Sequence, residues 1–98
     1  MNTINQTSEF STWLRELKDL AARAAIITRV QRAEAGTFGD CEPVGEGVSE
    51  MRIHVGAGYR VYFVQRGKRI YLLLCGGDKS SQKRDIKRAK EMARNIEE

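Results

Sequence analysis

The chain has 98 residues, of which 41% are hydrophobic and 31% are charged, and its formal net charge is +4. This length predicts one domain covering residues 1–98, and the hydrophobic content excludes a disordered chain. The longest apolar runs are too short to cross a membrane, and the first residues lack the basic and apolar regions of a signal peptide. We therefore expect a cytoplasmic protein that does not act at a membrane.

The charge is distributed unevenly along the chain. Residues 1–50 contain 5 Lys and Arg against 8 Asp and Glu, a balance of −3, whereas residues 51–98 contain 12 against 5, a balance of +7. A basic half of this strength favours an anionic partner such as RNA, DNA or a phosphate-rich surface. A solvated helix rich in Lys and Arg would explain the same charge equally well.

The two cysteines, Cys41 and Cys75, are expected to be free thiols, with Cys75 buried at the end of an apolar run. The sequence contains no CxxC motif and no Cys/His cluster. We therefore expect no metal and no cofactor, and the chemistry would come from ordinary side chains.

The first third of the chain predicts a short strand over residues 2–6 followed by helices. Thr7 or Ser8, and later Asp19, are suitable helix caps. Apolar residues recur at spacings of three and four on both sides of Asp19, and Gly36 is a typical C-terminal stop. We interpret residues 7–35 as two helices that form a hairpin, with one bent helix as the alternative.

The middle of the chain predicts a loop and then three strands. Residues 37–47 contain three glycines and the only proline, Pro43, which favours a loop. The alternating residues 51–55, the aromatic and β-branched residues 59–65 and the apolar residues 69–75 predict an antiparallel meander. The third strand is expected at a central position, because residues 72–74 are apolar on both faces. Gly76 and Gly77 are expected to end it.

The last segment predicts a basic helix that runs to about Ile96 and is capped by Asp78, Ser80 or Ser81. The predicted fold class is therefore α+β, with an N-terminal helical pair, an antiparallel β-meander and a C-terminal helix. The glycines before this helix could cradle a phosphate at its N-terminus, although a simple strand-to-helix turn explains them equally well.

The hairpin around residues 56–58 gives the most specific chemical prediction. A three-residue loop would pair His54 with Arg60 and Arg52 with Tyr62, so that all four share one face; a bulge would shift this register. Such a patch suits RNA cleavage, because a histidine can move protons, arginines stabilise charge on phosphate and a tyrosine can stack on a base. The alternative is that the arginines are ordinary surface residues and Tyr62 is packing.

Residues 47–62 resemble the central hairpin of the RelE/ParE toxin superfamily. Residues 74–86, together with residues 10–14 and 36–40, resemble its HigB-like or phage-derived Gp49-like "addiction module killer" branch, so the likeness covers nearly the whole chain in order. The resemblance implies a RelE-like microbial RNase fold. It also implies the toxin of a type II toxin–antitoxin system, an endoribonuclease (mRNA interferase) that cleaves mRNA in the ribosomal A site by metal-independent attack of the 2′-hydroxyl.

The resemblance also assigns roles by position. It implies that Arg60 stabilises the phosphate, that Arg52 and His54 activate the nucleophile and hold phosphate, and that Lys79 is a further basic group at the catalytic site. RelE itself carries a tyrosine near the C-terminus, whereas no tyrosine follows Tyr71 here. We expect further RNA contacts from one strand residue and from the basic helix, through Tyr62, Lys83, Arg84 and Lys87.

The partners that the resemblance implies are the ribosome, its mRNA and a cognate antitoxin of the helix-turn-helix, HigA-like type. Two other functions fit the sequence. ParE-like toxins share the fold but inhibit DNA gyrase, and a non-catalytic module would use the basic helix to bind nucleic acid. The predicted patch of Arg52, His54 and Arg60 favours the nuclease.

Overall fold

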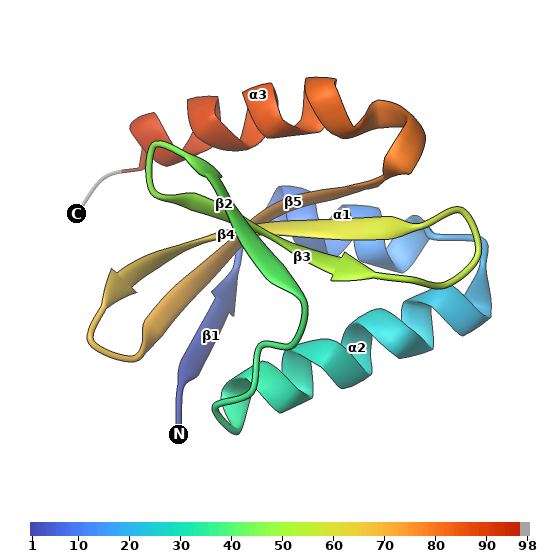
Figure 1. Ribbon diagram of the computed structural model, residues 1–98, viewed down its shortest axis with the longest axis horizontal. Helices are drawn as coiled ribbons and strands as arrows, with labels where there is room; N and C mark the ends of the chain where they lie inside the picture. The colour runs from blue at the N-terminus through green and yellow to red at the C-terminus, as the bar shows by residue number, and fades with distance from the viewer. Residues whose placement is uncertain (97–98) are drawn as a thin grey trace.

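The structure, a computed structural model, describes residues 1–96 and contains a five-stranded sheet in the order β1-β5-β4-β3-β2 (Figure 1). Strands β2 to β5 are antiparallel to their neighbours, whereas β1 lies parallel to β5. The predicted α+β class is confirmed. In chain order, the elements are β1 (Thr3–Gln6), α1 (Ser8–Glu16), α2 (Leu20–Glu34), β2 (Cys41–Gly45), β3 (Val48–Ile53), β4 (Tyr59–Gly67), β5 (Ile70–Asp78), the 3₁₀ turn η1 (Lys79–Ser81) and α3 (Gln82–Arg94).

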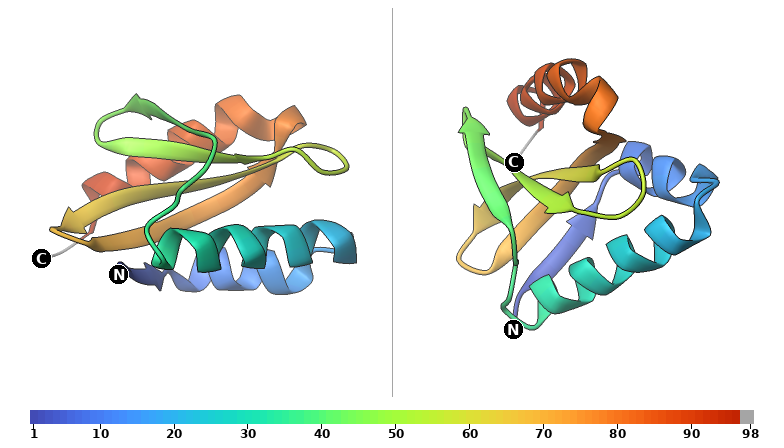
Figure 2. Two further views of the ribbon diagram at one scale, coloured as in Figure 1. Left: turned by 60° about the horizontal axis from the view of Figure 1, so that its bottom comes forward. Right: turned by 45° about the vertical axis from the view of Figure 1, so that its right-hand side comes forward.

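The two N-terminal helices form the predicted hairpin, because each begins at a side chain that caps it. The Thr7 hydroxyl accepts a hydrogen bond from the backbone N–H of Phe10, and the Asp19 carboxylate accepts one from Ala22 at 3.0 Å. Both helices cover the same face of the sheet (Figure 2). No helix in residues 1–96 is both long and apolar enough to span a bilayer.

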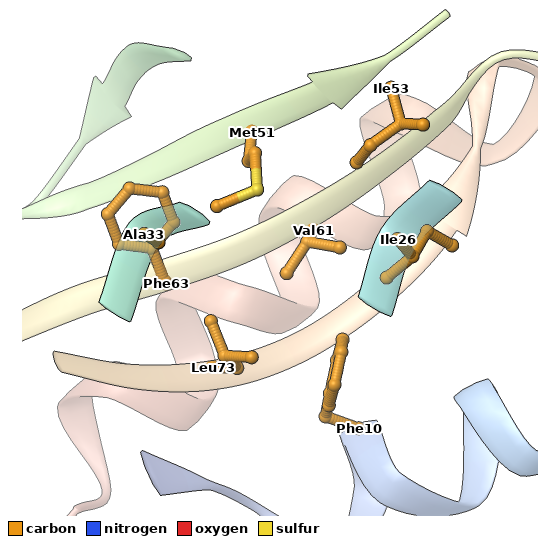
Figure 3. Close-up of a cluster of buried hydrophobic side chains, with 8 residues drawn as sticks. All are labelled: Phe10, Ile26, Ala33, Met51, Ile53, Val61, Phe63 and Leu73. Carbon is orange, nitrogen blue, oxygen red and sulfur yellow. The ribbon is translucent and has the colours of Figure 1, made fainter. Parts of the chain in front are cut away.

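The main core lies between these helices and the sheet. Alternate residues of β3, β4 and β5 point toward α1 and α2, as the period of two along a strand requires. Figure 3 shows how side chains from the two helices meet them. The buried members of this cluster are Phe10, Ile26, Ala33, Met51, Ile53, Val61, Phe63 and Leu73.

A second core lies under α3, on the opposite face of the sheet (Figure 1). Ala89 of α3 packs here against Val48, Tyr62 and Cys75. Burial raises the pKa of the Cys75 thiol to about 12, and both cysteines are free, as predicted. The first turn of α3 lies above Glu50 of β3, so α3 forms one wall of the region where the arginines of β3 and β4 lie.

One prediction for the middle of the chain is wrong, because residues 41–45 form a strand rather than part of a loop. Strand β2 lies at the edge of the sheet and pairs only with β3. An edge strand tolerates Pro43, because the missing N–H can be on the unpaired side. The pairing shifts between Pro43 and Gly45, where the chain turns back toward β3. The glycines that favoured a loop therefore mark only the ends of this strand.

The expected break at Gly76 and Gly77 is also wrong, because β5 continues through both to Asp78. The fold requires glycine at both positions because neighbouring side chains leave no room for a Cβ atom. A Cβ on Gly76 would lie 2.4 Å from the Trp13 ring, and a Cβ on Gly77 would lie 1.8 Å from a carboxylate oxygen of Asp85. The Asp85 carboxylate occupies the space beside Gly77, so these glycines form no phosphate cradle.

We expect Gly76→Ala to destabilise the fold by about 2 kcal/mol or more, because neither the β5 backbone nor the Trp13 ring can move away cheaply. Gly67→Ala is the matched control in β4, where a Cβ would meet Ile70 at 3.4–3.8 Å, an ordinary contact. Thermal denaturation should show a large fall in Tm for the first variant and no loss for the second. Equal melting temperatures would contradict the packing of Trp13 on β5.

Candidate functional site

Two arginines face each other across β3 and β4. Arg52 and Arg60 are directly paired, and Glu50 is paired with Tyr62. The predicted pairing of His54 with Arg60 is wrong, because β3 ends at Ile53 and the connection to β4 spans residues 54–58. The register differs from the predicted one by two residues, an even number, so Arg52, Arg60 and Tyr62 still share one face. Glu50 completes the group in place of His54.

Glu50 is the centre of this group, although the sequence analysis missed it. Its side chain is buried, and its Oε1 atom accepts a hydrogen bond from Nε of Arg52 at 3.1 Å. Its Oε2 atom lies 3.7 Å from Nε of Arg60. The Gln82 amide of α3 donates to both oxygens, at 3.3 and 3.0 Å. A buried carboxylate needs such partners. Glu50 therefore holds Arg52 by a hydrogen bond, forms a longer ion pair with Arg60, and connects both to α3 through Gln82.

Arg60 lies deeper than an ordinary outward-facing strand residue. Its side chain is only 12% exposed, and its Nε atom has no hydrogen-bond partner among the described residues. One terminal nitrogen reaches the Gly58 carbonyl at 3.5 Å, a weak contact. Arg60 therefore keeps most of its donors free.

Tyr62 is fully buried, and its hydroxyl also has no partner within residues 1–96. Burial, with the charge of Glu50 nearby, raises the pKa of Tyr62 far above its usual value, so the phenol stays neutral. The expected stacking of Tyr62 on an RNA base needs an exposed ring face, and this ring has none. We therefore assign Tyr62 to the core under α3.

Arg52 is surrounded by three carboxylates. Besides Glu50, its guanidinium contacts Glu42 closely and lies 3.9 Å from Asp40. The hydrogen bond that Arg52 donates to Glu50, followed by its hydrogen bond to Glu42 and the negative charges of Glu42 and Asp40, raises the pKa of Arg52 above its usual value. Glu42 and Asp40 are both well exposed, so an incoming anion could displace them from Arg52, whereas the buried Glu50 would stay.

His54 lies just beyond β3 and pairs with an acid. Its Nε2 atom is 2.7 Å from a carboxylate oxygen of Asp40, and its side chain is 72% exposed. This hydrogen bond holds the pKa of Asp40 below its usual value. Asp40 thus connects His54 to Arg52, and the Nδ1 atom of the ring forms no hydrogen bond within residues 1–96. The structure brings His54 close to Arg52 rather than opposite Arg60.

Lys79 lies next to Arg60, as the predicted site requires. Its backbone N–H donates to the Gly58 carbonyl at 2.7 Å, which is the same carbonyl that Arg60 contacts. The Lys79 side chain is exposed. The residues of α3 that we expect to contact RNA are exposed too. The Nε atom of Arg84 lies 3.9 Å from a carboxylate oxygen of Asp85. Lys83 and Lys87, at a spacing of four, lie on one side of this helix.

The basic half of the chain is partly neutralised by the acidic half. Arg88 of α3 contacts Glu9 of α1 at 2.7 Å, and Arg94 contacts Glu46 at 2.6 Å. These pairs join residues far apart in the sequence, so the charge count along the chain could not reveal them. Within residues 1–96, no group of three or more His, Cys, Asp or Glu side chains is arranged to hold a metal ion.

The family model for "Phage derived protein Gp49-like (DUF891)" matches residues 12–96. The chain belongs to the phage-derived Gp49-like family. A protein of Haemophilus influenzae (strain KW20 / Rd), described only as an uncharacterized protein, is 46% identical over 93 residues, which cover 95% of this chain and 94% of that protein. The Gp49-like match includes every residue of the candidate site, from Asp40 to Lys87, so the site lies within the part of the chain that defines the family.

Proposed function

We propose that this Gp49-like protein belongs to the RelE/ParE superfamily, is the toxin of a type II toxin–antitoxin pair, and cleaves mRNA in the ribosomal A site. The observation that carries this proposal is the pair of arginines, Arg52 and Arg60, held side by side on rigid strands by the buried Glu50. Lys79 adds a third cation beside Arg60. Phosphoryl chemistry needs cations placed in this way, because negative charge builds on the phosphate in the transition state.

The reaction is an attack of the ribose 2′-oxygen on the adjacent phosphorus. The bond from O2′ to phosphorus forms, the bond from phosphorus to O5′ breaks, a base takes the 2′-hydroxyl proton and an acid gives a proton to the leaving oxygen. Arg60 and Arg52 would bind the phosphate oxygens, since a guanidinium offers a fork of donors. Lys79 would stabilise or protonate the leaving oxygen. These side chains supply each required charge, so the proposed mechanism is metal-independent.

The base in this proposal is His54. If Nε2 carries the proton that Asp40 accepts, Nδ1 is left unprotonated and can accept the 2′-hydroxyl proton. An acid that holds a histidine in one tautomer is a recurring arrangement in catalysis. Glu42 is the alternative base in this proposal, because Arg52 holds its exposed carboxylate in the same region.

The ribosome and an antitoxin are the partners in this proposal. A protein of 98 residues has little surface with which to align a bare RNA strand, so the ribosome would supply the alignment. A cognate antitoxin, of the helix-turn-helix HigA-like kind, would neutralise the toxin. The exposed cations Lys83, Arg84 and Lys87 on α3 would attract the ribosomal RNA or mRNA backbone.

Induced expression followed by mapping of mRNA 5′ ends tests this function. We expect new ends in codon register within translated regions. The matched control is the same reporter mRNA with an early stop codon, which should lose every cut downstream of that codon. Cuts that persist there would contradict ribosome dependence. Intact mRNA with gyrase-linked DNA breaks would instead support the ParE-like function, and intact mRNA bound by the protein would support a non-catalytic module.

A further inference from the structure

A cavity of about 290 Å³ lies between α2 and the segment that follows β3. Its polar lining consists of Thr28, Arg29 and Arg32 from α2 and His54 from the connection to β4, while Ala25 and Val55 contribute apolar wall. Residues 25, 28, 29 and 32 recur at spacings of three and four, so they share one face of the helix. The cavity lies on the side of the sheet that α2 covers, whereas α3 covers the opposite face (Figure 2), and His54 is the residue that the cavity shares with the candidate site.

Arg29 gives this cavity a fixed positive charge. Its guanidinium donates to three backbone carbonyls, those of Arg52 at 2.6 Å, Phe38 at 2.9 Å and Asp40 at 3.4 Å. These carbonyls hold the group in place but carry no net charge. Among the described residues, no carboxylate oxygen lies within 4.0 Å of Arg29. The fold therefore holds the Arg29 guanidinium in one orientation, and no ion pair within residues 1–96 neutralises its charge.

Arg32 and Thr28 add donors that the described part of the chain does not use. Both side chains are available on the surface of α2, one turn apart, and neither makes a side-chain hydrogen bond or ion pair within residues 1–96. By contrast, Arg88 is paired with Glu9 and Arg94 with Glu46. The charge of Asp40 interacts with that of Arg29, but its carboxylate is bound by His54. The cavity therefore combines a hydroxyl with two guanidinium groups that form no ion pair within residues 1–96.

We propose that this cavity is a second anion site and binds a phosphate group. Arginine forks and a hydroxyl donor are the groups that recognise phosphate oxygens, and the cavity volume suits a small group rather than a large ligand. His54 lines the cavity, and Asp40 connects His54 to Arg52. If the proposed nuclease function holds, a phosphate of the RNA chain beyond the cleaved bond would occupy this site. The phosphate chemistry itself does not depend on that function.

The test is binding to the isolated protein, measured by NMR on a ¹⁵N-labelled sample titrated with inorganic phosphate and, separately, with hexauridylate. All proteins carry Arg60→Ala, so that binding at the candidate catalytic site is weakened. We expect hexauridylate to shift the signals of Thr28 and Arg32, which lie outside the candidate catalytic site. Arg32→Gln should weaken this binding by about tenfold, the loss expected for one charge-assisted contact. It should also lower the slope of the logarithm of the binding constant against the logarithm of the salt concentration, by about the amount that one phosphate contact contributes.

The matched control is Lys68→Gln, which removes the same charge from the exposed turn between β4 and β5 and should leave binding unchanged. Thr28→Val gives a second variant in the cavity. Shifts with inorganic phosphate but not with hexauridylate would assign the site to a free phosphate compound instead of RNA. The proposal is overturned if neither ligand shifts these signals, or if Lys68→Gln weakens binding as much as Arg32→Gln. Failure of mRNA cleavage in cells would leave this binding result unaffected, so the two proposals fail separately.

Discussion

Replacing Arg60 with alanine is expected to slow single-turnover cleavage on programmed ribosomes by about 10²–10³-fold, the usual cost of removing one donor from a developing oxyanion. Arg60 is suited to this role because Glu50 faces its Nε atom while its terminal nitrogens have few partners. Arg60→Lys should restore only part of the rate, because a single ammonium cannot reproduce the two-pronged contact of a guanidinium.

Stability and charge controls make this result interpretable. Arg60→Ala should stay folded and lose less stability than Glu50→Gln, because Glu50 keeps its hydrogen bonds from Arg52 and Gln82. Lys68→Ala removes one positive charge from an exposed turn and should cleave at the parent rate. If the folded Arg60→Ala protein cleaves as fast as the parent, Arg60 is not part of the catalytic site.

Replacing Glu50 with glutamine is expected to lower the free energy of unfolding by about 2–3 kcal/mol. Breaking a fully buried ion pair costs roughly 3–5 kcal/mol, and the cost is smaller here because Arg52 also reaches solvent and other acids. Without the carboxylate, Arg52 and Arg60 are like charges in directly paired strand positions, which is unfavourable. For a domain of this size, the Tm should fall by roughly 10–20 °C.

Glu42→Gln is the matched control for this prediction. Glu42 contacts the same guanidinium of Arg52, but its side chain is 62% exposed. Exposed ion pairs contribute little, so this variant should lose at most about 1 kcal/mol. Thermal and urea denaturation of both variants would measure the difference. If the two substitutions cost the same, Glu50 is not the central support of the arginine pair.

The helices and the faces of the strands could be predicted from the sequence, because they depend on local features. Thr7 and Asp19 cap their helices as expected. Met51 and Ile53 face the core under α1 and α2, while Arg52 faces the other side. A period of two along a strand sets these directions without reference to any partner strand.

The register of the hairpin and the course of β2 could not be predicted in this way. Register depends on where the connection between the strands begins, and the glycines at 56 and 58 allow either a short or a longer loop. The resulting shift of two residues replaces His54 with Glu50 in the arginine cluster. The only local indication that Glu50 belongs to this cluster is its position two residues before Arg52. The stability of its buried carboxylate depends on Gln82, which lies 32 positions later in the chain. Likewise, Pro43 in β2 is compatible with a strand only because that strand lies at the edge of the sheet.

The most direct measurement of the central claim compares the same mRNA on a programmed ribosome and free in solution, with purified protein under single-turnover conditions. The proposed function predicts cleavage within the A-site codon at a rate at least about 100-fold faster on the ribosome, because alignment of the 2′-hydroxyl is the contribution that this small protein lacks. Equal rates on both substrates, or no cleavage of ribosome-bound mRNA by the folded protein, would contradict it.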